Sequence, residues 1–134
     1  MGGNEGMSGD TIRLSLPREP GFRPVALLVA GGVAARLDLT VETLEDLEIG
    51  VESLIEVVNG DNATLELRLD PQAISASVGP IDDAAVREQL ADDAAAGVGL
   101  RRVLMTVSDG FGVVERDGMH WLSMEKRIPG GDGG

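Results

Sequence analysis

The sequence contains no cysteine, which excludes disulfide bonds, thiolate nucleophiles and cysteine-ligated zinc sites. Aromatic residues are almost as scarce, because only Phe22, Phe111 and Trp121 are present among 134 residues. A chain of this length fits one compact domain, and 43% of its residues are hydrophobic. We therefore expect a single core that is built mainly from leucine, valine, isoleucine and alanine.

Positive charge is also scarce. Lysine and arginine together number 11 against 23 aspartates and glutamates, which gives a formal net charge of −12. A protein that binds the phosphate backbone of nucleic acids needs a basic surface, so we expect no nucleic-acid partner. The acidic surface favours a basic partner instead.

Long apolar segments are missing as well. No stretch approaches the ~18 consecutive apolar residues of a membrane-spanning helix. The N-terminal segment MGGNEGMSGD lacks the basic start and apolar run of a secretory signal, so we expect a cytoplasmic protein with no membrane partner. Residues 1–10 and 129–134 have the glycine-rich, polar composition of disordered tails, which leaves 11–128 as the folded domain.

Hydrophobic periodicity predicts a strand and then two helices in the first half of the chain. TIRLSL, residues 11–16, alternates apolar and polar residues as a half-buried strand does. A first helix is predicted from Arg23 onward, and Gly31 and Gly32 within it indicate a close packing contact. Its predicted apolar face comprises Val25, Leu28, Val29, Val33 and Leu37. Thr40 is suited to cap a second helix. The apolar stripe of that helix comprises Leu44, Leu47, Val51, Leu54, Ile55 and Val58.

The second half of the chain is predicted to contain two hairpins and two short helices. Alternating residues predict a hairpin at 63–79 and another, FGVVERDGMHWLSMEKR, about an Asp-Gly turn at 117–118. Between them, Asp82 and Asp83 are suited to cap one helix, and a second helix begins near Leu100. The resulting order, β-α-α-β-β-α-α-β-β, predicts an α+β protein. We expect a two-layer α/β sandwich in which helices cover one face of a mostly antiparallel sheet.

A column of carboxylates is the first candidate functional feature. Glu48, Glu52 and Glu56 are spaced four residues apart, so a helix stacks them along one stripe, where like charges oppose helix formation. In an acidic protein, such a column is usually a solvated helix face. On the alternative interpretation, Glu52 or Glu56 faces a cleft as a catalytic base or metal ligand. No further ligand group accompanies the two carboxylates, so we predict no metal site.

A glycine-rich segment, GVGL at residues 97–100, is the second candidate. Gly97 and Gly99 would let backbone N–H groups approach an anion at the positive end of the helix that follows. The competing interpretation is a flexible glycine cap without a ligand. His120 lies beside Trp121 in a predicted strand, but no serine or cysteine has a sequence context that would pair with it. We assign His120 no role.

Taken in order, these features resemble the anti-sigma-factor serine kinases of bacteria, a branch of the histidine-kinase-like ATPase superfamily. The resemblance covers residues 11–128 and depends on the glutamate-bearing second helix GVESLIE, the GVGL helix entry and the closing hairpin. It implies a histidine-kinase-like ATPase fold, with ATP and magnesium held between helices and sheet. It also implies a protein that binds an alternative sigma factor and phosphorylates a serine on an anti-anti-sigma partner.

Residue by residue, the resemblance assigns Glu52 to the position of the family's catalytic glutamate. Glu56 stands where the family has a magnesium-holding asparagine. Gly79, followed by proline, stands where an aspartate would read the adenine amino group. Gly97, Gly99 and Leu100 match the third nucleotide-binding box as GVGL.

These departures predict an impaired nucleotide site. A carboxylate at position 56 would repel a triphosphate by about one to four kcal/mol in a partly shielded cleft. Loss of the adenine-reading aspartate removes about one to three kcal/mol more. Together these changes correspond to a loss of affinity on the order of a hundredfold or greater.

The leading hypothesis is therefore an anti-sigma-like regulator, a degenerate serine/threonine kinase that acts by binding a sigma factor or an anti-anti-sigma partner. Members of the family tend to associate, so the resemblance also suggests a homodimer as one assembly. One alternative is an active ATP-dependent serine kinase, with Glu52 as base and Glu56 as an unusual magnesium ligand. Another is a small acidic interaction domain that is unrelated to sigma regulation.

Overall fold

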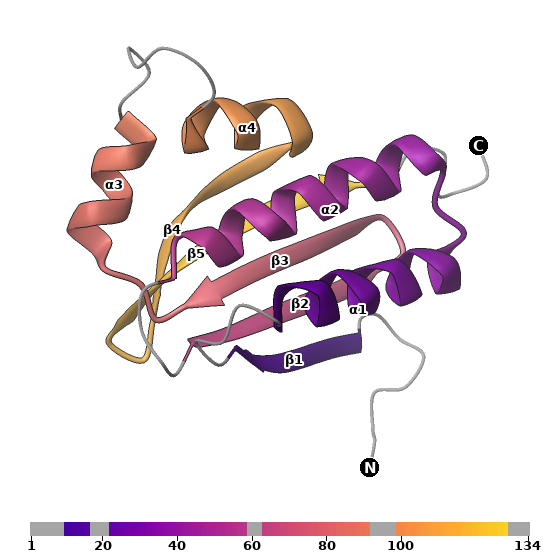
Figure 1. Ribbon diagram of the computed structural model, residues 1–134, viewed down its shortest axis with the longest axis horizontal. Coiled ribbons are helices and arrows are strands. Elements are labelled where there is room, and N and C mark those ends of the chain that lie inside the picture. The colour runs from indigo at the N-terminus through magenta and orange to yellow at the C-terminus, as the bar shows by residue number, and fades with distance from the viewer. Residues whose placement is uncertain (1–9, 17–21, 59–62, 92–98, 129–134) are drawn as a thin grey trace.

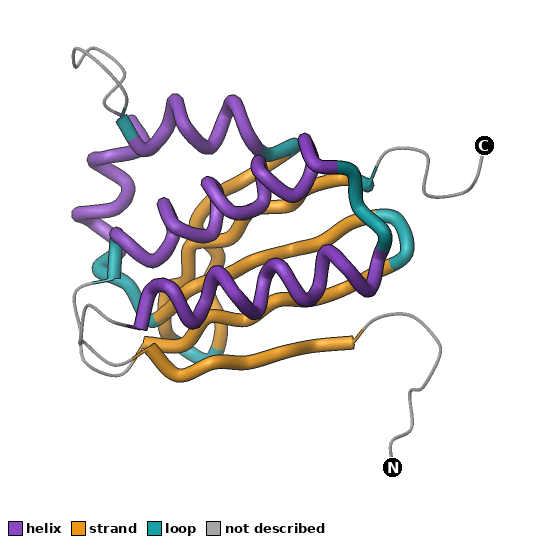
Figure 2. Tube along the Cα trace, turned by 45° about the vertical axis from the view of Figure 1, so that its right-hand side comes forward, coloured by secondary structure: helices purple, strands orange, loops and turns teal. Residues whose placement is uncertain are grey.

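The computed structural model describes residues 10–16, 22–58, 63–91 and 99–128. These residues form one five-stranded antiparallel sheet in the order β1-β2-β3-β5-β4, and four helices lie on one of its faces (Figures 1 and 2). The strands are β1 (Asp10–Leu16), β2 (Ala63–Asp70), β3 (Ala73–Gly79), β4 (Gly110–Arg116) and β5 (Met119–Arg127). The helices are α1 (Phe22–Leu37), α2 (Val41–Glu56), α3 (Asp83–Ala91) and α4 (Leu100–Val107). The predicted α+β class, with helices layered on an antiparallel sheet, is confirmed.

The two hairpins have the turns that the sequence predicts. β2 and β3 pair antiparallel about Pro71-Gln72, where the Gln72 N–H donates to Asp70 Oδ1 at 3.0 Å. β4 and β5 pair about Asp117 and Gly118, whose φ angles are +52° and +80°. A type I′ turn, the two-residue turn that matches the right-handed twist of the strands, requires positive φ at both of its central residues.

The second helix is capped and packed as its pattern predicts. Thr40 Oγ1 accepts a hydrogen bond from the Thr43 N–H at 3.1 Å, which satisfies a free donor of the first turn. Leu47, Val51 and Leu54 are fully buried. In α3 the corresponding cap is Asp82, whose carboxylate accepts from the Ala85 N–H at 3.2 Å.

Close approach of α2 to the sheet depends on a small residue. Gly50 is buried, and a Cβ added there would overlap the thioether of Met124 on β5. On the same strand, Lys126 Nζ donates to Asp46 Oδ2 of α2 at 2.9 Å. One apolar contact and one ion pair therefore hold α2 over β5.

The first helix buries only part of the predicted face. Val25 and Leu28, which the periodicity placed in the core, are 41% and 75% exposed. Ala26 and Ala30 are buried in their place, together with Val33, which the predicted face did include. The helix is apolar on nearly every side, so its periodicity does not distinguish the inner face, and small alanines allow the closest approach to the core.

The predicted packing contact at Gly31 and Gly32 is also wrong. A Cβ added at either glycine would meet nothing within 4 Å, apart from the helix's own backbone and the adjoining residues. Gly32 is exposed and Gly31 is half-buried. No close neighbour in the described structure therefore requires a glycine at either position.

The sheet has one apolar face and one polar face. Beneath the helices lie fully buried or nearly fully buried residues of β2, β3 and β5, namely Leu65, Leu67, Leu69, Ile74, Ala76, Val78, Leu122 and Met124. Because side chains alternate along a strand, the residues between them point to the opposite face, which no described helix covers. We call this second surface the open face.

No described helix is long and apolar enough to cross a membrane. β1 begins at Asp10, and the rest of the predicted N-terminal tail lies outside the described residues, as does the segment 129–134.

Candidate functional site

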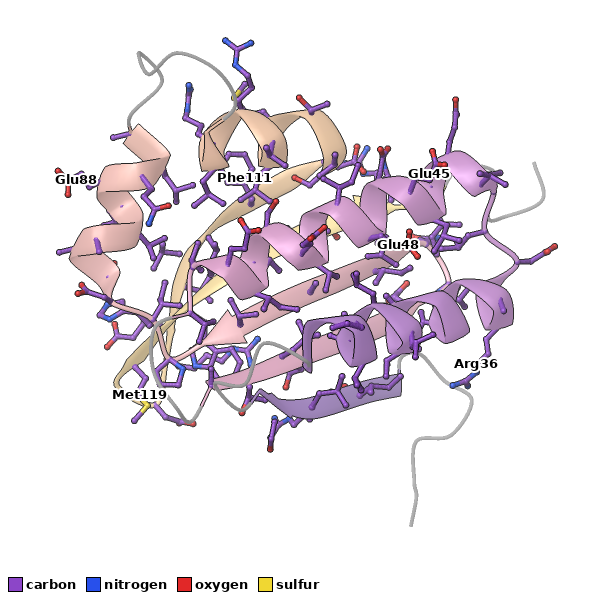
Figure 3. All side chains as sticks on the ribbon, viewed as in Figure 1. Arg36, Glu45, Glu48, Glu88, Phe111 and Met119 are labelled. Atoms are coloured by element: carbon purple, nitrogen blue, oxygen red, sulfur yellow. The ribbon has the colours of Figure 1, made fainter. Side chains whose placement is uncertain are left out.

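The two glutamates of the predicted nucleotide site lie on the outer side of α2. Glu52 is half-buried and Glu56 is exposed. Leu54 faces the core, and Glu56 follows it by two residues, which is about 200° around the helix axis. The third member of the column, Glu48, is half-buried and lies on the side of α2 toward α1 (Figure 3).

Gly79 lies on the open face, away from the helices. A Cβ added to this last residue of β3 would overlap the indole ring of Trp121 on the neighbouring strand β5. The adjacent residues Val78 and Leu122 are fully buried on the helix side, which places Gly79 and Trp121 together on the other side. The absence of a side chain at position 79 therefore makes room for the indole.

The glycine-rich segment is described only in part. Gly99 is the N-terminal cap of α4, with extended backbone and no side-chain hydrogen bond. Leu100 opens the helix and packs half-buried against the core. Gly97 lies outside the described residues, as do residues 59–62, which follow α2. The structure thus places Glu52, Glu56, Gly99 and Leu100 on the neighbouring helices α2 and α4, with Gly79 across the sheet.

A buried carboxylate is the main feature of the open face, and sequence reasoning missed it. Glu66, in the middle of β2, is only 3% exposed. Arg13 Nε donates to its Oε2 at 2.8 Å, and Arg116 Nη1 donates to its Oε1 at 2.9 Å. Pairing of the strands places Arg13 directly opposite Glu66, so alternation in β1 and β2 could have suggested that contact.

Arg116 reaches Glu66 from the far edge of the sheet. Its strand, β4, is separated from β2 by β5 and β3. An arginine side chain cannot span three inter-strand spacings of about 4.8 Å, so the β4–β5 hairpin must curl over the open face. The guanidinium carbon of Arg116 lies 4.5 Å from the ring centroid of Trp121, a cation–π distance.

The pKa of Glu66 reflects two opposing influences. Burial alone raises the pKa of this carboxyl, because a charged group loses its hydration. The hydrogen bonds and positive charges of Arg116 and Arg13 outweigh burial, so the pKa lies below its ordinary value of 4.5. Glu66 is consequently a carboxylate at neutral pH, held between two guanidinium groups.

A pocket of about 180 Å³ lies beside this ion pair on the open face. Its lining residues are Glu66, Arg68, Ser75, Ser77, Val114, Arg116 and Ser123. Ser77 Oγ donates to Ser123 Oγ at 2.9 Å and accepts from Arg116 Nη2 at 3.4 Å. The pocket therefore has a hydrogen-bonded polar floor and one apolar wall.

The outer surface of α1 and α2 is a second candidate region. It carries four large apolar residues that are 41–75% exposed, namely Val25, Leu28, Val41 and Ile49. Exposed carboxylates of Glu42 and Glu45 lie among them on α2, and Figure 3 shows Arg36 near the C-terminal end of α1. This surface offers apolar contact next to negative charge.

Neither region contains a metal-binding cluster. Among the described residues, no group of three histidine, aspartate or glutamate side chains could hold a metal ion. His120 Nε2 lies 3.9 Å from Asp83 Oδ2, a separation at the outer limit of an ion pair.

No known protein family and no curated protein matches this chain. The likeness to anti-sigma-factor serine kinases therefore stays a prediction, which depends on the residues quoted from the sequence.

Proposed function

We propose that this protein is a regulatory binding protein of the anti-sigma type, which holds a sigma factor or an anti-anti-sigma partner by surface contact and transfers no phosphoryl group. The observation that carries the proposal is the apolar outer surface of α1 and α2. Apolar residues that are gathered on the surface of a folded domain are typical of protein-interaction sites.

Helix α1 supplies most of this surface. Its sixteen residues include only two charged ones, Arg23 and Arg36, and its apolar residues are spread around the whole circumference. A helix with this composition is normally enclosed on all sides. Here Leu28 is 75% exposed and Val25 is 41% exposed, so the outward side is available for a partner.

The neighbouring charges define the kind of partner. Glu42 and Glu45 are exposed on α2, and the chain as a whole carries a formal charge of −12. An amphipathic helix with an apolar stripe and flanking lysines or arginines would complement this surface. Gly32 and Ala35 are small and exposed on α1, so they would allow such a helix to approach closely.

One feature of the predicted nucleotide site supports action without catalysis. Glu56 places an exposed carboxylate where the family has a neutral asparagine, and this charge disfavours a bound triphosphate.

The test is affinity capture from the native cell with three forms of the protein: wild type, Leu28→Lys and Met119→Lys. Met119 is a matched control, because it is a large apolar residue, 53% exposed, in the β4–β5 hairpin far from α1 (Figure 3). We expect wild type and Met119→Lys to retain a sigma factor or an anti-anti-sigma protein, identified by mass spectrometry. Leu28→Lys should lose it while keeping an unchanged melting temperature. Capture of neither class, or equal capture by all three forms, would contradict the proposal.

A further inference from the structure

The pocket on the open face plays no part in the proposed contact surface, because it lies on the other side of the sheet. We propose that it is a binding site for a small organic monocarboxylate. Its walls come from four strands: Glu66 and Arg68 of β2, the serines of β3 and β5, and Val114 and Arg116 of β4. It therefore exists only when the β4–β5 hairpin curls toward β2.

The charge of the lining favours one negative charge in the ligand. Two guanidinium groups, of Arg68 and Arg116, face one carboxylate, of Glu66, which leaves a net charge of one positive unit. Outside the lining, the positive charge of Arg13 on Glu66 is offset by the carboxylate of Glu125, which is paired with Ser75 across β3 and β5, so the surplus stays at one unit. This local excess occurs in a protein whose formal charge is −12, so it is not a reflection of composition.

Unused hydrogen-bond donors show where the ligand would be held. Each carboxylate oxygen of Glu66 already accepts a hydrogen bond, from Arg13 or Arg116, and Ser77 is engaged by Ser123 and Arg116. By contrast, the side chains of Arg68 and Ser75 make no hydrogen bond or ion pair to any residue that the structure describes. These two residues are directly paired across β2 and β3, so their free donors project side by side into the pocket.

A planar carboxylate suits these donors best. The guanidinium fork of Arg68 can donate two parallel hydrogen bonds to a carboxylate, and the Ser75 hydroxyl can donate a third. A phosphate dianion would bring a second negative charge close to Glu66, and the Glu66 carboxylate would repel that charge. Val114 provides an apolar wall for a short hydrocarbon part.

The size of the pocket limits the ligand further. Its volume of about 180 Å³ is slightly larger than the ~150 Å³ cavity that accommodates benzene. A carboxylic acid of three to five carbons, with or without a hydroxyl group, fits that volume. Hydroxyl groups on the ligand would find partners in Ser75 and Ser123.

The experiment titrates wild-type protein with 2-hydroxybutyrate and butyrate, and in parallel with inorganic phosphate and the uncharged analogue 1-butanol. Two readouts are available. Trp121 is the only tryptophan and stacks with Arg116 of the pocket, so its fluorescence reports occupancy, while amide NMR shifts of Ser75, Ser77 and Ser123 report location.

We expect saturable binding of at least one of the two carboxylates, and neither phosphate nor 1-butanol should bind as tightly. Arg68→Gln should weaken the carboxylate about tenfold or more, because a charge-assisted hydrogen bond is lost. Arg127→Gln is the matched control, since Arg127 is an exposed arginine at the end of β5 outside the pocket, and it should leave the affinity unchanged. Absence of saturable binding by both carboxylates, tighter binding of phosphate, or equal effects of the two substitutions would overturn the proposal.

Discussion

Arg116 donates a 2.9 Å hydrogen bond to Glu66, although two other strands lie between β4 and β2 in the sheet. The contact joins the last hairpin of the chain to its second strand across the open face. It also explains how a carboxylate can be 3% exposed on a face that no described helix covers. Arg116 thus contacts both the Trp121 ring and the Glu66 carboxylate.

Removing Arg116 should destabilise the fold more than removing the other partner of Glu66. Arg116→Met leaves a buried carboxylate with a single partner and should lower the free energy of unfolding by about 2 kcal/mol. Arg13 is 69% exposed, so Arg13→Met should lower it by only about 0.5–1 kcal/mol. Urea unfolding of both variants provides the comparison, and equal losses would show that Arg116 has no special role.

The ion pairs of Glu66 should make the free energy of unfolding depend on pH. The folded-state pKa of Glu66 is lower than the ordinary value of 4.5, so the unfolded chain takes up the proton first as the pH falls. The stabilisation is therefore complete above about pH 5, and it is lost as the pH falls through 4.5 and on through the folded-state pKa. Wild type and Glu66→Gln should differ in unfolding free energy at neutral pH, and the difference should shrink in acid. A difference that stays constant between pH 7 and pH 3 would contradict this assignment.

Gly79 is expected to be required for the position of Trp121. In Gly79→Ala the new methyl group would occupy the space of the rigid indole, which should lower the unfolding free energy by about 1–3 kcal/mol. Because Trp121 is the only tryptophan, its emission should shift to longer wavelength as the ring moves toward water. Emission identical to wild type would show that the indole does not depend on the glycine.

The glycines of α1 should behave in the opposite way. Gly31→Ala and Gly32→Ala introduce a methyl group into open space and a better helix former, so each should raise the unfolding free energy by about 0.5–1 kcal/mol. Gly50→Ala is the control, because its methyl group would meet the buried thioether of Met124 and should be destabilising. Thermal unfolding of the three variants shows directly whether each substitution raises or lowers stability. Destabilisation by Gly31→Ala would contradict the open space at this position and indicate a neighbour that contacts α1.

Local patterns were sufficient for most of the fold. Strand alternation, the Asp117-Gly118 turn and the Thr40 cap are short-range signals, and the structure bears each of them out. The inner face of α1 was predicted only in part, at Val33, because apolar residues surround the whole helix and their spacing does not distinguish one side.

The open-face site depends on contacts between residues that are distant in the sequence. Arg116 and Glu66 are 50 residues apart and are brought together only by the curl of the β4–β5 hairpin. Gly79 could be identified as a special position, but the sequence offered no sign that Trp121 would lie against it. Of the residues expected at the nucleotide site, Glu52 and Glu56 lie on the outer side of α2, and their roles stay a prediction.

The most direct test of the central claim is a calorimetric titration of the purified protein with the sigma factor or anti-anti-sigma protein that it captures, without nucleotide and with magnesium-ATP. We expect the same affinity under both conditions, and a loss of affinity in Leu28→Lys. Binding that requires ATP, or transfer of its terminal phosphate to a serine of the partner, would show instead that the protein is a working kinase.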